Sequence, residues 1–494
     1  MKKLSSADRD FFLKVYNSAS LNPFSTERQA SDGSALGVAS GAQPFAHLHG
    51  LLGEIKRRTD ALAADGVGMD NLPPDEAKLF EMAVLFLTIH QYCRPLDSYI
   101  VAQSERNGEP LPAECGAAIF AHLRSLGFTV AFAERCVAVF FQLRRAYLFI
   151  SSGLVGECES MRRLRVELWN AVFTSDLRLY LDSLWNRMED FSTLLLGETG
   201  TGKGAAAMAI GRSNYIPYIS RRRAFAENFN DAFLSINLSE FSESLIESEL
   251  FGHVKGAFTG AVGDHDGIFS RCSNHGAIFL DEIGDVSERV QIKLLKVLQE
   301  RSFSPVGGYQ KIRFGGRLVA ATNQDLARRR AEGTFRNDFY YRLSSSHIVV
   351  PPLRQRIAEN PDEVRLLLKR IIRRLTGEGN PVLADRVRAA IARDLPQDYG
   401  WPGNVRELEQ ATRSIIVTGS YHGEAGATPA AAKAADAGLA KVANCELSLD
   451  ELQRWYCRRL YDRLGSYGDA ARRLGIDWRT VKEKVSASTL HPRE

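Results

Sequence analysis

At residues 197–204 the chain reads Gly197-Glu198-Thr199-Gly200-Thr201-Gly202-Lys203-Gly204, between an apolar, β-rich run at 192–196 and a helical run at 205–210. A glycine-rich turn that follows a strand and opens a helix is the setting of a phosphate-binding P-loop. The glycines let backbone amides face phosphate oxygens, the helix N-terminus adds a positive dipole, and Lys203 would reach the β- and γ-phosphates. A glycine-rich turn without a ligand is the alternative.

A second motif completes such a site about eighty residues later. The apolar run 278–280 ends in two carboxylates, Asp281 and Glu282. A strand that ends beside the phosphates would let Asp281 hold Mg²⁺, directly or through water. Glu282 would then polarise the attacking water. An exposed acidic strand end is the alternative, but the two motifs together are far more specific than either one alone.

The middle of the chain has the pattern of an α/β fold. Apolar runs at 192–196, 233–236, 277–280 and 317–321 alternate with helical segments. Continuous apolar strands separated by helices indicate a mostly parallel sheet that is covered on both faces.

Two further stretches resemble the AAA+ ATPase domain of sigma-54-dependent activators, also called bacterial enhancer-binding proteins. The first is Glu247-Ser248-Glu249-Leu250-Phe251-Gly252-His253, and the second is Gly256-Ala257-Phe258-Thr259-Gly260-Ala261, the signature loop of that family. Physically, the second stretch is a small-residue loop with one exposed aromatic residue, and its glycines permit tight bends. The resemblance covers roughly residues 152–420 and the C-terminal helices.

The resemblance implies a role for several other residues. Asn323 would sense the γ-phosphate, Asn237 would couple Glu282 to the signature loop, and Arg406 would contact the nucleotide as the second sensor. Arg336 and Arg342 would reach the nucleotide of a neighbouring subunit, where a guanidinium stabilises charge during phosphoryl transfer. The alternative for both arginines is a solvated surface position. The implied ligands are ATP and Mg²⁺, and the implied partner is the sigma-54 form of RNA polymerase.

The chain departs from the family pattern at three places. Gly204 stands where P-loops have Ser or Thr and this family usually has Glu, so we expect the local phosphate-loop chemistry to be tuned differently. Asn337 replaces a common glutamate. The stretch between Ile210 and Phe233, which includes Arg221-Arg222-Arg223, looks longer than usual, and we expect a solvated loop rather than an insertion with its own contacts.

Residues 1–150 are expected to be mostly helical. Apolar residues recur at helical spacing, Pro73-Pro74-Asp75 is a helix-start signal, and Gly127 is a helix stop. The region lacks the strand–helix alternation of a phosphoreceiver domain. Its position predicts a signal-input or partner-docking domain that restrains the ATPase.

The C-terminal end has the pattern of a Fis-type helix-turn-helix. Residues 467–474 and 478 onward read as two helices around Gly475, Asp477 is a candidate N-cap, and Ile476 is expected in the apolar interface. A preceding helix at 452–464 would pair with its twin to form a dimer. The expected contacts with double-stranded DNA are Arg472, Arg473, Trp478, Arg479, Thr480, Lys482 and Lys484. A helical hairpin without a DNA role is the alternative.

Composition sets the wider limits. The 494 residues carry a net charge of +4, and the seven cysteines show neither zinc-site nor disulfide spacing. The N-terminus lacks the apolar run of a signal peptide, and we expect a cytoplasmic protein with no membrane contact.

The sequence therefore predicts a multidomain regulator. Its expected parts are a mostly α N-terminal domain (1–150), an α/β AAA+ P-loop subdomain (152–345), a helical lid (346–420), an Ala/Gly-rich linker (421–445) and the helix-turn-helix (446–494). It would assemble from dimers to a hexamer and use ATP to open promoter DNA. Two alternatives stay open: an AAA+ remodeller of another protein, and a DNA-binding repressor with an inactive ATPase.

Overall fold

A computed structural model describes residues 2–28, 31, 44–423 and 447–486. The chain forms two compact units, one of residues up to 388 together with 403–417, and one of residues 389–402 together with 418 onward. The linker predicted at 421–445 lies almost wholly outside the described residues. Within the described ranges, no helix combines the length and the apolar character that a bilayer crossing needs.

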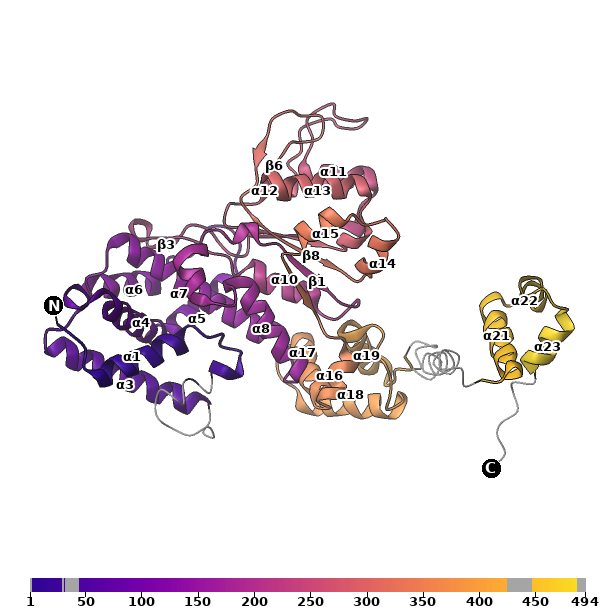
Figure 1. Cartoon of the computed structure of the whole chain (residues 1–494), viewed down its shortest axis with the longest axis horizontal. Coiled ribbons are helices and arrows are strands. Elements are labelled where there is room, and N and C mark those ends of the chain that lie inside the picture. The colour runs from indigo at the N-terminus through magenta and orange to yellow at the C-terminus, as the bar shows by residue number, and fades with distance from the viewer. Residues whose placement is uncertain (1, 29–30, 32–43, 424–446, 487–494) are drawn as a thin grey trace. The chain divides into compact units, whose positions relative to one another are not determined.

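The N-terminal region is helical, as predicted (Figure 1). Pro74 is the first residue of its helix, and Gly127, at φ +90°, follows the last turn of another. The expected boundary at residue 150 falls inside the longest helix, α7. The helices are α1 (Ser6–Ala19), α3 (Pro44–Ala64), η1 (Met69–Asn71), α4 (Pro74–Gln91), α5 (Cys93–Ser104), α6 (Glu114–Ser125) and α7 (Val130–Gly153).

A short series of helices leads from α7 into the sheet: α8 (Glu159–Phe173), α9 (Leu177–Leu179), the π-helical turn η2 (Tyr180–Leu184) and η3 (Met188–Asp190). The sheet has the order β4-β5-β8-β1-β9 and is parallel throughout. Its strands are β1 (Thr193–Leu196), β4 (Phe233–Asn237), β5 (Ala277–Asp281), β8 (Arg317–Thr322) and β9 (Ser346–Val349). The four predicted strands are confirmed, and β9 adds a fifth at the edge.

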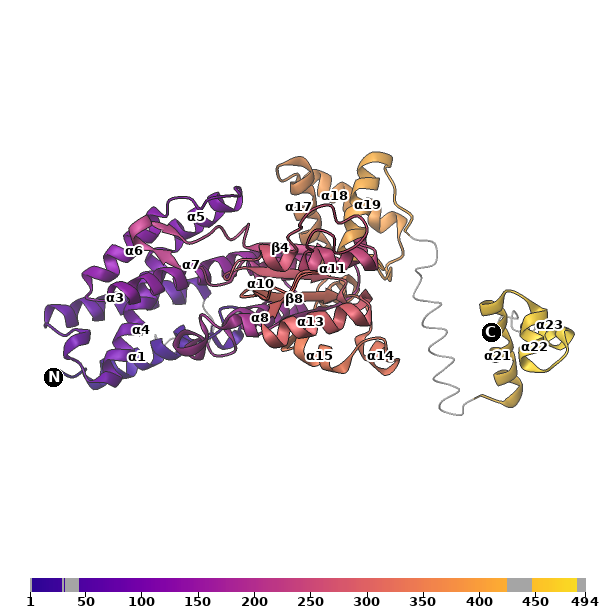
Figure 2. The same ribbon diagram turned by 90° about the horizontal axis from the view of Figure 1, so that it is seen from above.

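Successive side chains of each strand point to opposite faces of the sheet, and each face packs into its own apolar core. Ile278 and Leu280 face one core, whereas Phe279 between them faces the other. Helices α11 (Glu243–Phe251), α12 (Ile268–Arg271), α13 (Glu288–Glu300) and α15 (Asn337–Leu343) cover the first face. Helices α8 and α10 (Lys203–Gly211) cover the second, and Figure 2 shows α10 and α13 on opposite sides of β8.

The remaining elements surround this core. Short turns are η5 (Leu238–Glu240), η6 (Ile283–Asp285) and α14 (Leu326–Ala331), and a small hairpin consists of β6 (Ser302–Phe303) and β7 (Ile312–Arg313). The lid helices are α16 (Leu353–Glu359), α17 (Glu363–Thr376), α18 (Pro381–Asp394) and α19 (Asn404–Thr418).

The stretch between α10 and β4 is not a solvated loop, and that expectation was wrong. It contains the hairpin β2 (Tyr218–Ile219) and β3 (Ala224–Phe225), joined by η4 (Ser220–Arg222). Phe225 is buried and stacks on Phe141 of α7 with ring centroids 3.8 Å apart. Apolar side chains at both ends of the basic triplet turn the segment inward, and the three arginines face solvent.

In the C-terminal unit, the described residues 447–486 form three helices: α21 (Leu449–Leu464), α22 (Tyr467–Leu474) and α23 (Trp478–Ser486). Gly475, at φ +66°, makes the turn between the last two, and the Asp477 carboxylate accepts from the Arg479 amide at 2.8 Å. The predicted helices and N-cap are therefore confirmed. The expectation for Ile476 was wrong, because this side chain is 43% exposed. The small core consists of Cys457, Leu460, Ala470, Ala471, Val481 and Val485.

Candidate functional site

The loop 197–204 joins β1 to α10 at the carboxyl end of the sheet. Gly197, Gly200 and Gly202 have φ values of +152°, +79° and +108°, which only glycine adopts without strain. Lys203 donates to the carbonyls of Gly197 at 2.8 Å and Glu198 at 3.1 Å. Burial lowers the pKa of this lysine, and the nearby Glu282 and Asp281 charges oppose that effect.

Gly204 stands in open space. Nothing lies within 4 Å of the position that a Cβ would take there. A larger side chain would therefore fit, and the glycine is not required by packing. Its effect is chemical, since it offers no hydroxyl or carboxylate to a metal ion.

The two carboxylates lie where strand β5 ends. Glu282 has a positive φ of +55°, which turns its backbone sharply out of the strand. The Asn323 amide donates to the Glu282 carboxylate at 3.3 Å, and the Asn323 side chain donates to the Thr199 hydroxyl at 2.8 Å. Burial raises the pKa of Glu282. The structure thus brings together the P-loop, the acidic strand end and the predicted sensor on β8.

Asn237 lies beside Asp281, because the two residues are register partners in β4 and β5. Its side chain caps the following turn by accepting from the Ser239 amide at 3.2 Å, and it donates to Glu240 at 3.1 Å. In this structure it therefore contacts its own turn rather than Glu282.

The lid closes on the P-loop through residues that the sequence did not single out. Arg354 of α16 forms a bidentate ion pair with Glu198, at 2.5 and 2.7 Å. Asn404 at the start of α19 donates to Glu198 at 3.1 Å and to the Thr199 carbonyl at 3.0 Å. A Cβ on Gly200 would lie 3.0 Å from the Cβ of Arg406, so the predicted second sensor is beside the loop.

The two arginines that are predicted to reach the nucleotide of a neighbouring subunit lie at opposite ends of α15. Arg336 is the N-cap, and Arg342 is in the last turn. Arg336 is paired with Asp338 at 2.8 Å and with Glu288 at 2.9 Å, and these bonds raise its pKa. Arg342 is exposed and donates to the Leu298 carbonyl at 2.9 Å. In the described part of the chain, neither guanidinium bonds to a residue of the P-loop.

The loop 256–261 extends from the core beyond α11. Gly256 and Gly260 have φ values of +81° and +107°, and the Gly256 amide donates to the Ala261 carbonyl at 2.9 Å. The Phe258 ring is 39% exposed and packs edge-on against His253, with centroids 4.9 Å apart. The predicted tight bends and exposed aromatic are therefore present.

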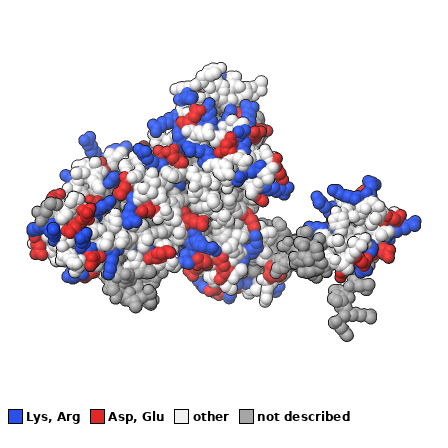
Figure 3. Space-filling model, in the orientation of Figure 1, with Lys and Arg blue, Asp and Glu red and all other residues white. Residues whose placement is uncertain are grey.

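Of the predicted DNA contacts, Arg472, Arg473, Trp478, Arg479, Thr480 and Lys482 are exposed. Lys484 is only 24% exposed and forms an ion pair with Asp450 of α21. Lysine and arginine side chains project from several sides of this unit in Figure 3.

A parallel sheet with a P-loop, strand-end carboxylates, an asparagine sensor and a helical lid defines an AAA+ ATPase domain. The family described as "Sigma-54 interaction domain" matches residues 182–349. The transcriptional regulatory protein ZraR of Klebsiella oxytoca is 36% identical over 343 residues, which is 68% of each chain. The chain therefore belongs to the family of sigma-54-dependent transcriptional activators.

Two other relatives match over a shorter share of their own length. The regulatory protein AtoC of Escherichia coli K12 is 38% identical over 255 residues, 51% of this chain and 51% of AtoC. The Nif-specific regulatory protein of Azotobacter vinelandii is 36% identical over 359 residues, 69% of this chain and 60% of the relative. The chain thus spans about half to two thirds of the length of these relatives.

Proposed function

We propose that copies of this chain assemble into a ring, hydrolyse ATP between neighbouring subunits, and use the loop 256–261 to remodel sigma-54 RNA polymerase at promoter DNA. One observation carries the proposal. Lys203, Glu282 and Asn323 meet at one edge of the sheet, on the body that also presents the exposed Phe258. Such a protein would act in the cytoplasm.

The side chains around the P-loop fit ATP. The amides of the loop and Lys203 would hold the phosphates, and Arg406 would approach from the lid. Asp281 would hold Mg²⁺, which neutralises charge on the phosphates when it is bound. Gly204 would contribute no ligand to the metal. The Asp281 carboxylate would therefore contribute a larger share of metal binding than in a P-loop with Ser or Thr.

Assembly would complete the site. Arg342 is exposed and bonded only to a carbonyl oxygen, so a neighbouring phosphate would not have to displace a carboxylate. Arg336 would first have to leave Asp338 and Glu288. An arginine supplied in trans contributes about three to five orders of magnitude in rate in related phosphoryl-transfer systems. Hydrolysis should therefore rise steeply with protein concentration.

We also propose that residues 1–150 regulate the ATPase. The buried Arg145 of α7 donates to the carbonyls of Arg212 at 2.8 Å and Asn214 at 2.7 Å, just beyond the P-loop helix α10. Gln142 donates to the Ser213 carbonyl at 2.9 Å. A displacement of α7 would therefore act on the helix that carries Lys203.

The C-terminal unit is proposed to bind double-stranded DNA as a dimer. Its last helix, α23, presents Arg479 and Lys482 to solvent on a unit that has a small apolar core. Binding upstream of a promoter would raise the local concentration of the ATPase near the polymerase.

The test is ATP hydrolysis against protein concentration, with and without a sigma-54 closed promoter complex, with open-complex formation scored in parallel. Cooperative hydrolysis with opening supports the proposal. Hydrolysis without opening favours a remodeller of another protein. Absence of hydrolysis in every condition favours a DNA-binding repressor with an inactive ATPase.

Two variants separate the steps. Thr259→Ala should keep ATP hydrolysis and lose promoter opening, because the loop tip lies away from the P-loop. Arg342→Ala should bind ATP and hydrolyse it poorly. Normal promoter opening by the first variant would exclude the loop assignment, and wild-type turnover by the second would exclude the proposed role of Arg342 in a neighbouring subunit's site.

A further inference from the structure

A cleft of about 490 Å³ lies at the edge of the sheet opposite to the P-loop. Its walls include Gly276, which directly precedes β5, and Arg317, the first residue of β8. Because the strands are parallel, these residues mark the amino edge, whereas Glu282 follows the carboxyl end of β5. The volume is within the range of about 300–1,000 Å³ that small-molecule sites occupy.

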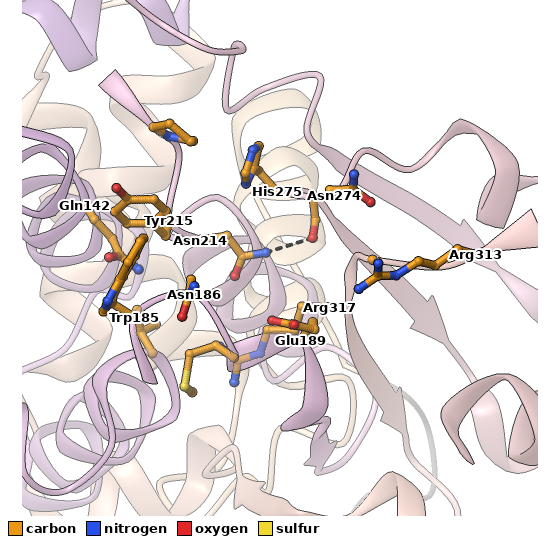
Figure 4. A pocket seen from close by; sticks show the side chains of 15 residues that line it. Gln142, Trp185, Asn186, Glu189, Asn214, Tyr215, Asn274, His275, Arg313 and Arg317 are labelled. Atoms are coloured by element: carbon orange, nitrogen blue, oxygen red, sulfur yellow. Dashed lines mark hydrogen bonds between the residues drawn. The ribbon is translucent and has the colours of Figure 1, made fainter. Parts of the chain in front are cut away.

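The cleft joins three parts of the chain. Gln142 comes from the N-terminal helical region, Trp185 from the turn that follows η2, and Asn214 from the segment after α10. In Figure 4, Trp185 and Tyr215 lie on one side and Asn274 and Arg313 on the other, with Asn214 between them.

One side of the cleft is aromatic. The rings of Trp185 and Tyr215 have centroids 4.7 Å apart at an angle of 63°. Both side chains are partly exposed, and the Arg135 guanidinium lies 5.9 Å from the centroid of the Trp185 ring. Stacking on such rings is a common way to hold a nucleic-acid base without selecting its sequence.

The other side offers a cation and an unused amide. Arg313 is exposed and, among the described residues, has no carboxylate partner. Asn274 on this side, and Asn186 beside Trp185 on the aromatic side, are exposed and have no hydrogen-bond partner among the described residues. Their donors and acceptors match heteroatoms on a ring edge, and a purely carbocyclic ring would leave them unpaired. Glu189 is an acidic residue in the same wall, below Arg317 in Figure 4.

We propose that this cleft binds a nucleoside monophosphate, with the base against Trp185 and Tyr215 and the phosphate at Arg313. The site is separate from the ATP site, which lies at the other edge of the sheet. Arginine is suited to the phosphate because its planar guanidinium can form two parallel hydrogen bonds.

The cleft is connected to the ATPase machinery through its floor. Asn214 donates to the Gly276 carbonyl at 2.9 Å, and the same carbonyl accepts from the Arg317 amide at 2.9 Å. Asn214 also accepts from Arg145 through its own carbonyl. A ligand here therefore contacts the segments that lead to Lys203 on α10 and to Glu282 after β5. Regulation by this ligand rests on the proposed function, whereas binding does not.

Binding is tested by calorimetric titration of the full chain with 5′-AMP, 5′-GMP and 5′-UMP, with benzoate as a carbocyclic anion. Arg313→Gln should weaken monophosphate binding about ten- to hundredfold, the usual effect of losing a hydrogen bond to a charged group. It should leave ADP binding at the P-loop unchanged. Lys203→Ala should weaken ADP binding at the P-loop and leave monophosphate binding unchanged. Arg222→Gln, which removes an equally exposed arginine outside the cleft, is the matched control.

Several results would overturn the proposal. These are no binding of any monophosphate, binding that survives Arg313→Gln, binding lost in Lys203→Ala, and benzoate binding as tightly as 5′-AMP. Thermal unfolding checks that Arg313→Gln is folded. Asn186→Ala changes an exposed residue in a different segment of the cleft wall. This variant should also weaken monophosphate binding and so tests the site independently of Arg313. A chain that binds 5′-AMP but never hydrolyses ATP would contradict the proposed function and leave this site in place.

Discussion

At the scale of single residues, Glu282 shows how backbone geometry positions the carboxylate that we propose as the general base. Its positive φ turns the carboxylate out of β5, and the Asn323 amide holds it beside the P-loop. Partial burial raises the pKa of the carboxyl group. A general base must be ionised to accept a proton, so a raised pKa places the group closer to the pH at which proton transfer is most efficient.

The first prediction concerns the pH dependence of hydrolysis. As pH falls through the pKa of Glu282, the carboxylate is protonated and the rate of ATP hydrolysis should fall. This loss should occur at a higher pH than for an ordinary glutamate. Glu282→Gln should reduce the rate at neutral pH by about two to four orders of magnitude and keep ATP binding. Steady-state hydrolysis across acid to neutral pH measures both effects.

Glu332→Gln is the control, since this exposed residue pairs only with Arg328 on the surface. It should keep the wild-type rate and pH profile. A Glu282→Gln variant that hydrolyses ATP normally would assign the base to another residue.

The second prediction separates two lysines of α23. Lys482 is exposed, whereas Lys484 is largely covered and paired with Asp450. Lys482→Ala should weaken DNA binding and reduce the slope of log affinity against log salt by about 1, because one phosphate contact is lost. Lys484→Ala should change DNA affinity much less. Fluorescence anisotropy with a DNA duplex at several salt concentrations measures the slopes, and equal effects of both variants would contradict the assignment.

At the scale of elements, the loop 256–261 depends on a neighbouring hairpin. The Val254 amide donates to the Val306 carbonyl at 3.1 Å, and the Val306 amide donates to the Gly252 carbonyl at 2.8 Å. Gly307 has φ +77°, and a Cβ there would lie 2.8 Å from the Cβ of Ala257. The hairpin therefore fixes the base of the loop, and Gly307 is needed for the close approach.

The third prediction is that Gly307→Ala displaces the loop and lowers promoter opening severalfold, with ATP hydrolysis retained. Gly308→Ala is the matched control. Its φ lies outside the left-handed region, and its Cβ would lie 3.3 Å from a Val254 methyl group and 3.4 Å from the Pro305 carbonyl oxygen. Parallel assays of hydrolysis and opening distinguish the two variants, and equal loss of opening in both would count against a specific role for Gly307.

Local pattern explains which elements could be predicted from the sequence. The P-loop, the four predicted strands and the Asp477 cap each depend on residues within about ten positions of one another. The pairs Glu198–Arg354 and Gln142–Ser213 join residues 156 and 71 positions apart, and no local pattern marks them. The same holds for the hairpin at 218–225, whose apolar ends have partners only in the folded N-terminal region.

At the scale of the whole molecule, the N-terminal helices are packed against the ATPase core and share its apolar interior. Ile216, Tyr218, Phe225 and Phe229 come from the segment after α10, and each is at most 3% exposed. They are covered by α5, α6 and α7 in a single cluster. These apolar side chains of the AAA+ domain are therefore buried by the N-terminal helices rather than by the domain itself.

The fourth prediction follows from that packing. Deletion of residues 1–150 should expose these four side chains, each of which contributes about 1.5–3 kcal/mol when buried. The truncated chain should therefore aggregate and bind a hydrophobic dye, and the double substitution Tyr218→Ser with Phe225→Ser should partly restore solubility. A chain that ends at residue 423 is the control, because it keeps α5, α6 and α7. Soluble yield and dye fluorescence are the measurements. A truncated chain that stays monodisperse, binds no dye and hydrolyses ATP would show that the core folds independently of the helices. The proposed control of α10 through Arg145 would then have to act without shared packing.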